Sequence, residues 1–336
     1  MTQWQASASF ELIRLRADTL RTIRSFFHKN NVLEVDTPTL SSATVPDPFI
    51  ESFQTQYVPL MQTMQTNHFY LHTSPEFPMK RLLASGSGSI FQISKVFRQG
   101  ESGKKHNPEF TLLEWYRDGW DHLQLMTEVD QLFTLLLSPH LALGETRLLT
   151  YEDAFQEMLG INPHRANKKD LLDCTEKIGL ANVLDEHEDK DRLLELLFSH
   201  IIEPALGKSN KSEQSNKSYI CFIYHYPVSQ ASLAKTCMHK GQLVAERFEV
   251  FIDGMELGNA FHELNDVQEQ RQRFEKDNQT RKLMGLKEIP MDEYFLEAVA
   301  TLPACAGVAV GIERLLMIMS QSQHINDVIA FPFDRA

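Results

Sequence analysis

The stretch FRQGESGKKHNPEFTLLEWYR, residues 97–117, decides the fold of this 336-residue chain and concentrates its chemistry. One apolar run ends at Arg98, a basic loop follows, and a second run carries Glu114 among apolar residues. Two extended runs joined by a polar loop predict a pair of antiparallel strands. His106 and Asn107 close the loop, so that cations and amide donors converge as anion binding requires. A solvated hairpin tip is the alternative explanation.

The bulk composition bounds the class of protein. The chain is long enough for one large or two ordinary domains, and 42% of its residues are hydrophobic. Its 45 acidic against 33 basic residues give a formal net charge of −12, which disfavours extended nucleic-acid binding. The N-terminus lacks the pattern of a secretory leader, and no apolar run is long enough to span a bilayer, so we expect a cytoplasmic protein.

Periodicity predicts the elements of the first half. Apolar residues at steps of three and four predict a helix over 9–30, and VLEVDTPTL follows as a short strand that Pro38 ends. Residues 69–117 are predicted as paired strands, and residues 121–206 as mainly helical, with one apolar stripe at Met126, Val129, Phe133 and Leu136. The polar stretch 208–218 is predicted to be a surface loop.

Strands return in the second half, at residues 219–234 and 246–261, where Asp253-Gly254 is a hairpin signal. A charged helix is predicted from Asp266, a second helix from Pro290, and a strand, glycine turn and helix over 307–320. Locally paired strands and grouped helices indicate an α+β fold, with a central antiparallel sheet flanked by helices.

Two further segments carry residues suited to phosphate and metal. Gly311 precedes a predicted helix with Arg314 one turn in, an arrangement that suits a polyphosphate at a helix N-terminus. A close strand–helix contact is the alternative. A bend or a bulge around Gly258 could bring Glu256 and Glu263 to one site, where paired carboxylates would bind Mg²⁺. An exposed strand edge is the alternative.

Three side chains set within apolar runs suit recognition of an amine: Glu76, Glu114 and Tyr116. An ammonium and a carboxylate about 4 Å apart gain ~1 kcal/mol in water and ~4 kcal/mol at an effective dielectric constant near 20. Partly buried carboxylates therefore recognise an amine well. Internal pairing with one of the chain's own basic residues is the alternative.

Together these segments resemble the signature motifs of class II aminoacyl-tRNA synthetases. VLEVDTPTL is similar to the first motif, residues 97–117 to the second and GVAVGIERLL to the third. SPEFPMKRLL, KHNPEF and ELGNAFHELND resemble, in this order, the corresponding segments of lysyl-tRNA synthetases. The resemblance covers the chain from about residue 9 to its end. It implies the catalytic domain of this class.

The length of the chain before the first motif narrows the resemblance. Only some thirty residues precede it, so we expect no anticodon-binding domain. We expect a single catalytic domain over 1–336, with residues 121–218 as a mainly helical insertion between the second and third motifs. EWYR and the terminal VIAFPFDRA closely resemble a truncated paralogue family, the elongation factor P lysine ligases, whose members attach (R)-β-lysine to a lysine of that translation factor.

The resemblance implies an ATP-dependent ligase with elongation factor P as its protein substrate, and a homodimer through the first motif. tRNA is not expected as a partner. Two alternatives stay open: a minimal lysyl-tRNA synthetase-like enzyme acting on RNA, and a catalytically inactive regulatory paralogue. A ligase that forms a small amide is a third.

The resemblance also implies the residue roles, with ATP and Mg²⁺ as cofactors. Arg98 would hold the α-phosphate, Arg314 the γ-phosphate and Glu256 the metal, and these three are the expected catalytic residues. The expected ATP-binding residues are Arg98, Gln99, Gly100, Glu101, His106, Asn107, Glu256, Leu257, Gly311 and Arg314. The expected metal ligands are Glu256 and Glu263. The residues expected to line the amino-acid pocket are Ser74, Pro75, Glu76, Glu114, Tyr116, Asn259 and Glu263.

Two departures from the synthetase pattern fall within these segments. Synthetases usually have Arg-x-Glu in the second motif, whereas here Glu101 stands three residues after Arg98. Lysyl-tRNA synthetases tend to have alanine at the position of Ser74 and glycine at that of Ala309. We expect the last two changes to reshape the pocket for a β-amino acid.

Overall fold

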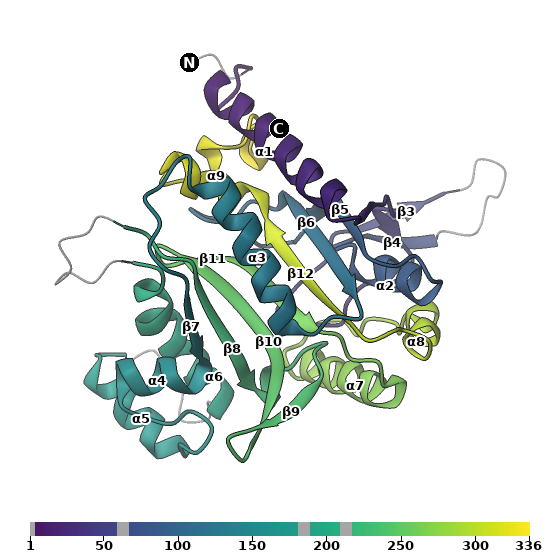
Figure 1. Ribbon diagram of the computed structural model, residues 1–336. Coiled ribbons are helices and arrows are strands. Elements are labelled where there is room, and N and C mark those ends of the chain that lie inside the picture. The colour runs from purple at the N-terminus through teal and green to yellow at the C-terminus, as the bar shows by residue number, and fades with distance from the viewer. Residues whose placement is uncertain (1–3, 59–66, 181–188, 209–216) are drawn as a thin grey trace. The chain divides into compact units, whose positions relative to one another are not determined.

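The computed structural model describes residues 4–58, 67–180, 189–208 and 217–336 (Figure 1). Most of the polar loop predicted at 208–218 therefore lies outside the described residues. The chain divides into two compact units, which we describe separately. Unit 1 comprises Met1–Trp120 with Leu264–Ala336, and unit 2 comprises Asp121–Glu263.

Unit 1 contains a sheet with the strand order β1-β5-β6-β12 and a smaller sheet with the order β2-β4-β3. The strands are β1 (Leu33–Glu34), β2 (Leu40–Ser41), β3 (Gln54–Tyr57), β4 (Asn67–Leu71), β5 (Ile90–Phe97), β6 (Glu109–Asp118) and β12 (Cys305–Gly311). The predicted antiparallel pair is confirmed, because β5 and β6 pair in register from Ile90↔Tyr116 to Phe97↔Glu109. The sheet is mixed rather than purely antiparallel, because β1 runs parallel to β5.

The helices of unit 1 are α1 (Phe10–Lys29), α2 (Glu76–Ala84), α7 (Val267–Leu283), α8 (Glu293–Val299) and α9 (Ile312–Ser320). The predicted first helix is confirmed, with Ser9 as its N-cap. The prediction of strands throughout 69–117 is wrong at α2. Pro78 falls in the first turn of this helix, where a missing backbone N–H breaks no hydrogen bond.

Strand β6 is buried on both faces, which places helices on each side of it (Figure 1). On one face, Trp115 packs against Phe27 of α1 with ring centroids 5.2 Å apart. On the other, Tyr116 packs against Met79 and Leu83 of α2. Because successive strand residues alternate between faces, Glu114 points to the α2 side together with Tyr116.

Unit 2 contains a sheet with the strand order β11-β10-β8-β7, and β9 pairs with β10. The strands are β7 (Arg147–Thr150), β8 (Cys221–Pro227), β9 (Thr236–His239), β10 (Gln242–Ile252) and β11 (Met255–His262). The hairpin prediction is confirmed, because Asp253 and Gly254 join β10 to β11 with φ of 52° and 73°. Such left-handed values suit the tight turn of a two-residue hairpin. β7 runs parallel to β8.

The helices of unit 2 are α3 (His122–Leu137), α4 (Tyr151–Leu159), α5 (Lys168–Lys177) and α6 (Lys190–Leu197), followed by short irregular helical turns. The predicted apolar stripe of α3 is buried along its length. Strand β7 interrupts the segment predicted as helical. In the described residues, no helix is both long and apolar enough to cross a membrane.

Candidate active site

Glu114 lies at the centre of a buried polar cluster in unit 1. It is 2% exposed, and its carboxylate accepts hydrogen bonds from the Ser74 hydroxyl at 2.7 Å and from the Tyr116 hydroxyl at 2.6 Å. The Ser74 hydroxyl in turn accepts a hydrogen bond from the backbone N–H of Glu76 at 3.0 Å. Pro75 is the N-cap residue of α2. The structure thus brings these five residues, all predicted to line the amino-acid pocket, into one place.

Glu76 has a partner that the sequence analysis did not identify. Lys80 lies one helical turn later, and its Nζ is 2.6 Å from Glu76 Oε1. Lys80 is 1% exposed and lies over the ring of Phe295, 5.9 Å from its centroid. The alternative of an internal ion pair therefore applies to Glu76, whereas two hydroxyls hold Glu114. Within the described residues, the carboxylates of Glu76 and Glu114 lie near a single ammonium, that of Lys80, so the cluster has an excess of negative charge when both carboxylates are ionised.

The electrostatics of Glu114 follow from this setting. Burial and, to a smaller extent, the negative charge of Glu76 raise its pKa, which is about 7 once all its neighbours act on it. The hydrogen bonds from Ser74 and Tyr116, and the charge of Lys80, act in the opposite direction. A cation entering the cluster would favour the ionised carboxylate. The cluster is therefore suited to an ammonium group.

Ser74 and Ala309, the two positions that depart from the lysyl-tRNA synthetase pattern, both lie beside Glu114. Ser74 supplies one of the two hydroxyls that bind its carboxylate. Ala309 of β12 is its direct partner in the antiparallel pair of β12 and β6. Side chains at directly opposite positions lie on the same face of a sheet, with Cβ atoms ~5 Å apart. The two substitutions therefore change the shape of a single site.

The basic loop between β5 and β6 holds Arg98 close to Glu101. Their side chains form an ion pair at 3.7 Å, and the Arg98 guanidinium lies 5.1 Å from the ring centroid of Phe110. Gly100 has φ of +86°, and a Cβ built on it would meet nothing within 4 Å. The Gln99 backbone N–H donates to the Glu51 carbonyl at 2.8 Å. Glu101, displaced from its usual place in the motif, is thus next to the arginine.

The second and third motifs meet through Arg314 and His106. Arg314 Nη2 donates to His106 Nε2 at 2.6 Å, and its Nε lies 3.4 Å from the Lys105 carbonyl oxygen. Gly311 is the N-cap residue of α9, and a Cβ built there would meet only the Arg314 side chain, at 3.9 Å. The N-terminus of α9 therefore has backbone N–H groups beside a guanidinium, an arrangement that favours phosphate.

Asn107 occupies a different setting from the other loop residues. It is 6% exposed, its side-chain N–H donates to the Glu109 carbonyl at 2.6 Å, and its side-chain oxygen accepts from the Phe333 backbone N–H at 3.1 Å. The amide thus ties the loop to the C-terminal segment.

Two partly buried ion pairs that the sequence analysis missed position the loop and the strand. Arg281 of α7, 1% exposed, donates to the Glu51 carboxylate at 2.8 Å, and the same Glu51 backbone receives the Gln99 N–H. Glu313 of α9 accepts from Arg16 at 2.8 Å and from the Thr111 backbone N–H at 2.8 Å. Their partners lie far apart in sequence, so no spacing could have revealed them.

In unit 2, strand β11 carries the remaining predicted residues. Its pairing with β10 shifts register between Val250↔Gly258 and Phe251↔Glu256, which leaves Leu257 as an extra residue. The predicted bulge near Gly258 is thus present. An extra residue reverses the alternation of faces between Glu256 and the end of the strand. Glu263, 1% exposed, forms an isolated bridge with Ala234 just beyond β11.

Asn259 belongs to a partly buried charged cluster that the sequence analysis missed. Arg247 donates to Asn259 Oδ1 at 3.0 Å and also binds Glu249, which accepts from the Tyr226 hydroxyl at 2.7 Å. The pKa of Glu249 is raised to about 7, chiefly by burial; the charge of Arg247 acts against this rise and the charge of Glu256 adds to it. Residues two positions apart on a strand lie on the same face of a sheet, so the spacing of Arg247 and Glu249 could have predicted that they pair.

This arrangement of two antiparallel strands, a basic loop and a glycine-started helix is that of a known class. The sequence profile of tRNA synthetases class II (D, K and N) matches residues 1–335. The chain belongs to this family of class II tRNA synthetases. The resemblance inferred from the three motifs is confirmed.

Curated relatives specify the resemblance further. The chain is 47% identical over 337 residues to a protein of Edwardsiella ictaluri, covering 100% of this chain and 99% of the relative. It is 46% identical to a protein of Vibrio parahaemolyticus and 45% identical to one of Pseudoalteromonas translucida, each match covering 99% of this chain and 98% of the relative. All three relatives are named elongation factor P–(R)-beta-lysine ligase.

Proposed function

We propose that this protein is an ATP-dependent ligase. It activates (R)-β-lysine, or lysine, as an aminoacyl adenylate and transfers it to the ε-amine of a specific lysine on elongation factor P. The names of the near-full-length relatives support this proposal. The observation that carries it is the buried carboxylate of Glu114, held by Ser74 and Tyr116 beside the Glu76–Lys80 pair.

The cluster around Glu114 recognises the amine of the amino acid. A substrate ammonium entering it would stabilise the ionised carboxylate, whose pKa is raised to about 7, chiefly by burial. A neutral side chain would leave a desolvated carboxylate without a partner, which is costly. Lysine-type substrates are therefore selected against amino acids without a second amine far more strongly than against those differing by a methylene.

The residues expected to bind ATP have the chemistry that a triphosphate requires. Arg98 and Arg314 supply guanidinium groups, and the N-terminus of α9 supplies backbone donors. Gly100 and Gly311 leave room for the nucleotide to approach the backbone. Glu101, which forms an ion pair with Arg98, is the proposed reader of the adenine.

The carboxylates of β10 and β11 have the oxygen donors that Mg²⁺ prefers. Glu256 and Glu263 are the proposed ligands. Bound Mg²⁺ would neutralise charge on the triphosphate. Leu257, at the bulge, is proposed to contact the adenosine through its backbone.

The reaction proceeds in two proposed steps. The carboxylate of the amino acid attacks the α-phosphorus of ATP, the bond to the β-phosphate oxygen breaks and pyrophosphate leaves. Arg98 and Arg314 stabilise the negative charge that develops on the phosphates. The neutral ε-amine of the acceptor lysine then attacks the carbonyl carbon, AMP leaves and the amine loses a proton. The product is an amide.

We place this reaction in the cytoplasm, in a homodimer formed through the first motif. Pro38 and Leu40 of that motif are exposed, as a dimer interface would require. The formal net charge of −12 does not favour tRNA as the acceptor.

One experiment tests the function. Purified elongation factor P is incubated with the protein, ATP and either lysine isomer, and its intact mass is measured; bulk tRNA with labelled lysine serves as the competing acceptor. We expect a gain of one lysyl residue on elongation factor P, together with AMP. Label on tRNA instead would support the RNA-directed alternative. No ATP–pyrophosphate exchange with any amino acid would support an inactive paralogue.

A further inference from the structure

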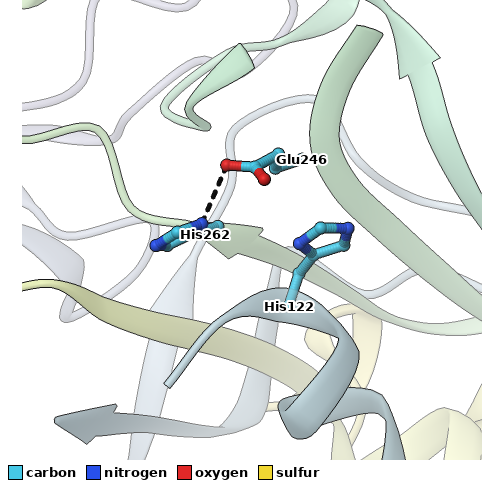
Figure 2. A group of neighbouring side chains, drawn as sticks. All are labelled: His122, Glu246 and His262. Carbon is cyan, nitrogen blue, oxygen red and sulfur yellow. Dashed lines mark hydrogen bonds and ion pairs between the residues drawn. The ribbon is translucent and has the colours of Figure 1, made fainter. Parts of the chain in front are cut away.

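Three side chains from separate elements of unit 2 point toward one another at a place that the proposed reaction does not use (Figure 2). His122 is the first residue of α3, Glu246 lies in β10 and His262 ends β11. Each offers one ligand atom, and these atoms all lie within 4.8 Å of one another. Glu246 Oε2 and His262 Nδ1 are 2.8 Å apart. This group is called the His–Glu cluster below.

The imidazole ring of His122 is polar and buried, yet no hydrogen bond from the described residues compensates for its burial. It is 3% exposed, and within the described part of the chain neither of its ring nitrogens has a hydrogen-bond partner. A buried polar group without a partner costs ~1–3 kcal/mol, so native structures rarely contain one without a reason. Burial lowers the pKa of His122, which keeps the ring neutral and able to act as a metal ligand.

The backbone around the cluster is held by hydrogen bonds that do not involve the ligand atoms. The Lys235 N–H donates to the His262 carbonyl at 2.8 Å, and the Glu246 N–H donates to the Lys235 carbonyl at 2.8 Å. The Asp121 capping box fixes the first turn of α3, which carries His122. Rigid elements therefore hold all three ligands, as a metal site requires.

We propose that His122, Glu246 and His262 bind a divalent transition-metal ion of the zinc type. Two imidazoles and one carboxylate are a zinc ligand set that leaves a fourth position for water. Tetrahedral zinc with ligands at ~2.0–2.2 Å places them ~3.4 Å apart, so small rotations of the side chains complete the site. The Glu246–His262 hydrogen bond opens when the ion enters.

This site differs in chemistry from the carboxylate pair proposed for Mg²⁺. Imidazole nitrogens select zinc, copper or nickel, whereas Mg²⁺ prefers oxygen ligands in an octahedral arrangement. The proposed ion links the first helix of unit 2 to its last strand. It also fixes His262, which directly precedes the buried Glu263. The proposed function of the ion is thus to position the end of β11. Binding of the ion does not depend on the proposed reaction.

Two neighbouring histidines provide a control. The ring centroid of His225 lies 5.4 Å from that of His122, and the ring centroid of His239 lies 4.4 Å from that of His225. Neither belongs to the group whose ligand atoms converge. If three defined ligands make the site, replacing His225 should leave Zn²⁺ affinity unchanged. If several histidines bind the ion without a defined geometry, replacing His225 should weaken Zn²⁺ binding as much as replacing His122.

Metal binding by the full-length protein tests the proposal. The protein is treated with a chelator and titrated calorimetrically with Zn²⁺ and, separately, with Mg²⁺; bound metal is counted by elemental analysis. Co²⁺ serves as a spectroscopic probe. We expect one tight equivalent of Zn²⁺, a higher melting temperature on binding, and Co²⁺ bands without thiolate charge transfer. The last result excludes the chain's free cysteines as ligands.

Variants assign the ligands. Glu246→Gln, which keeps a hydrogen-bonding group, and His122→Asn should each weaken Zn²⁺ binding by ~100-fold or more, whereas His225→Asn should leave it within a few fold. Melting curves of the metal-free variants check the fold. The proposal is overturned if the wild-type protein binds no stoichiometric Zn²⁺, if thiolate bands appear, or if Glu246→Gln binds Zn²⁺ as tightly as the wild-type protein.

Discussion

Ala309 lies directly opposite Glu114 across the pair of β12 and β6, so its methyl group and the buried carboxylate are on the same face of the sheet. Ala309→Gly removes that methyl group from the proposed pocket. We expect the ratio of kcat/KM for α-lysine over (R)-β-lysine to rise ~10-fold, because one methyl-sized group is worth ~1–3 kcal/mol in such a pocket. ATP–pyrophosphate exchange with each isomer measures the ratio.

The matched control is Ala306→Gly. Ala306 belongs to the same strand and is buried, but it lies opposite Arg117 and therefore on the other face of the sheet. The Ala306→Gly variant should leave the ratio of kcat/KM for the two lysine isomers unchanged. An equal effect of the two variants would mean that backbone flexibility, rather than pocket shape, sets the preference.

Glu114→Gln should remove recognition of the amine while ATP binding remains. The amide keeps the size of the side chain but cannot pair with an ammonium, so we expect kcat/KM for lysine-type substrates to fall ~100-fold or more. Exchange kinetics and direct nucleotide binding separate the two effects. Glu109→Gln on the same strand is the control, because Glu109 is half-exposed and pairs with Lys95 at 3.3 Å. Unchanged amino-acid selectivity in Glu114→Gln would contradict the assignment.

The raised pKa of Glu114 also predicts a pH dependence of stability. The ordinary value of 4.5 becomes about 7 in the folded state, so between these values the folded protein binds a proton that the unfolded chain has released. The contribution of Glu114 to the free energy of unfolding is therefore full below about pH 4.5 and is lost as the pH rises through about 7. We therefore compare the melting temperature of Glu114→Gln with that of the wild-type protein at the same pH. The difference, variant minus wild type, should be more positive at ~pH 8 than at ~pH 5.

Comparing the variant with wild type removes the contribution of the buried histidines. Burial lowers the pKa of His72 and His122, which makes stability rise with pH in the acidic range. The two trends oppose each other in the wild-type protein. Scanning calorimetry across the range measures the difference, and a difference independent of pH would show that Glu114 is ionised throughout.

The local elements could be predicted from sequence where one signal dominated. The Asp253-Gly254 turn and the apolar stripes of α1 and α3 were sufficient signals. Helix α2 was missed because Pro78 falls in its first turn, the one part of a helix that tolerates proline. Predicting a strand there also concealed Lys80, since the Glu76–Lys80 spacing has meaning only on a helix.

The site could be predicted only where its residues share a motif. Glu114 and Tyr116 are neighbours on one face of β6, so the strand pattern placed them together. The His–Glu cluster has no such signal, because His122, Glu246 and His262 are far apart in sequence and only the folded unit 2 brings them together. Long-range pairs such as Arg281–Glu51 were hidden for the same reason.

Arg98→Ala should abolish formation of the adenylate. Its guanidinium is the proposed partner of the α-phosphate, and loss of one such group lowers the rate by ~10²–10³-fold or more. ATP–pyrophosphate exchange measures the loss, and a melting curve confirms that the variant is folded. The control is Arg192→Ala, because Arg192 forms an exposed ion pair with Glu195 and has no proposed role. Near-normal exchange by Arg98→Ala would refute the phosphate assignment.

The exposed apolar residues of the first motif predict the oligomeric state. Leu33 and Leu40 are 57% and 42% exposed, and Pro38 between them is exposed as well. Burying such side chains stabilises an interface by about 25 cal/mol per Å² of apolar area, and placing a carboxylate there would reverse the gain. Leu40→Asp should therefore convert a dimer into a monomer in light scattering after gel filtration, and Pro38→Gly should weaken the dimer. Leu283→Asp on α7, where the leucine is 89% exposed, should leave the mass unchanged. A wild-type protein that is monomeric at micromolar concentration would contradict the predicted interface.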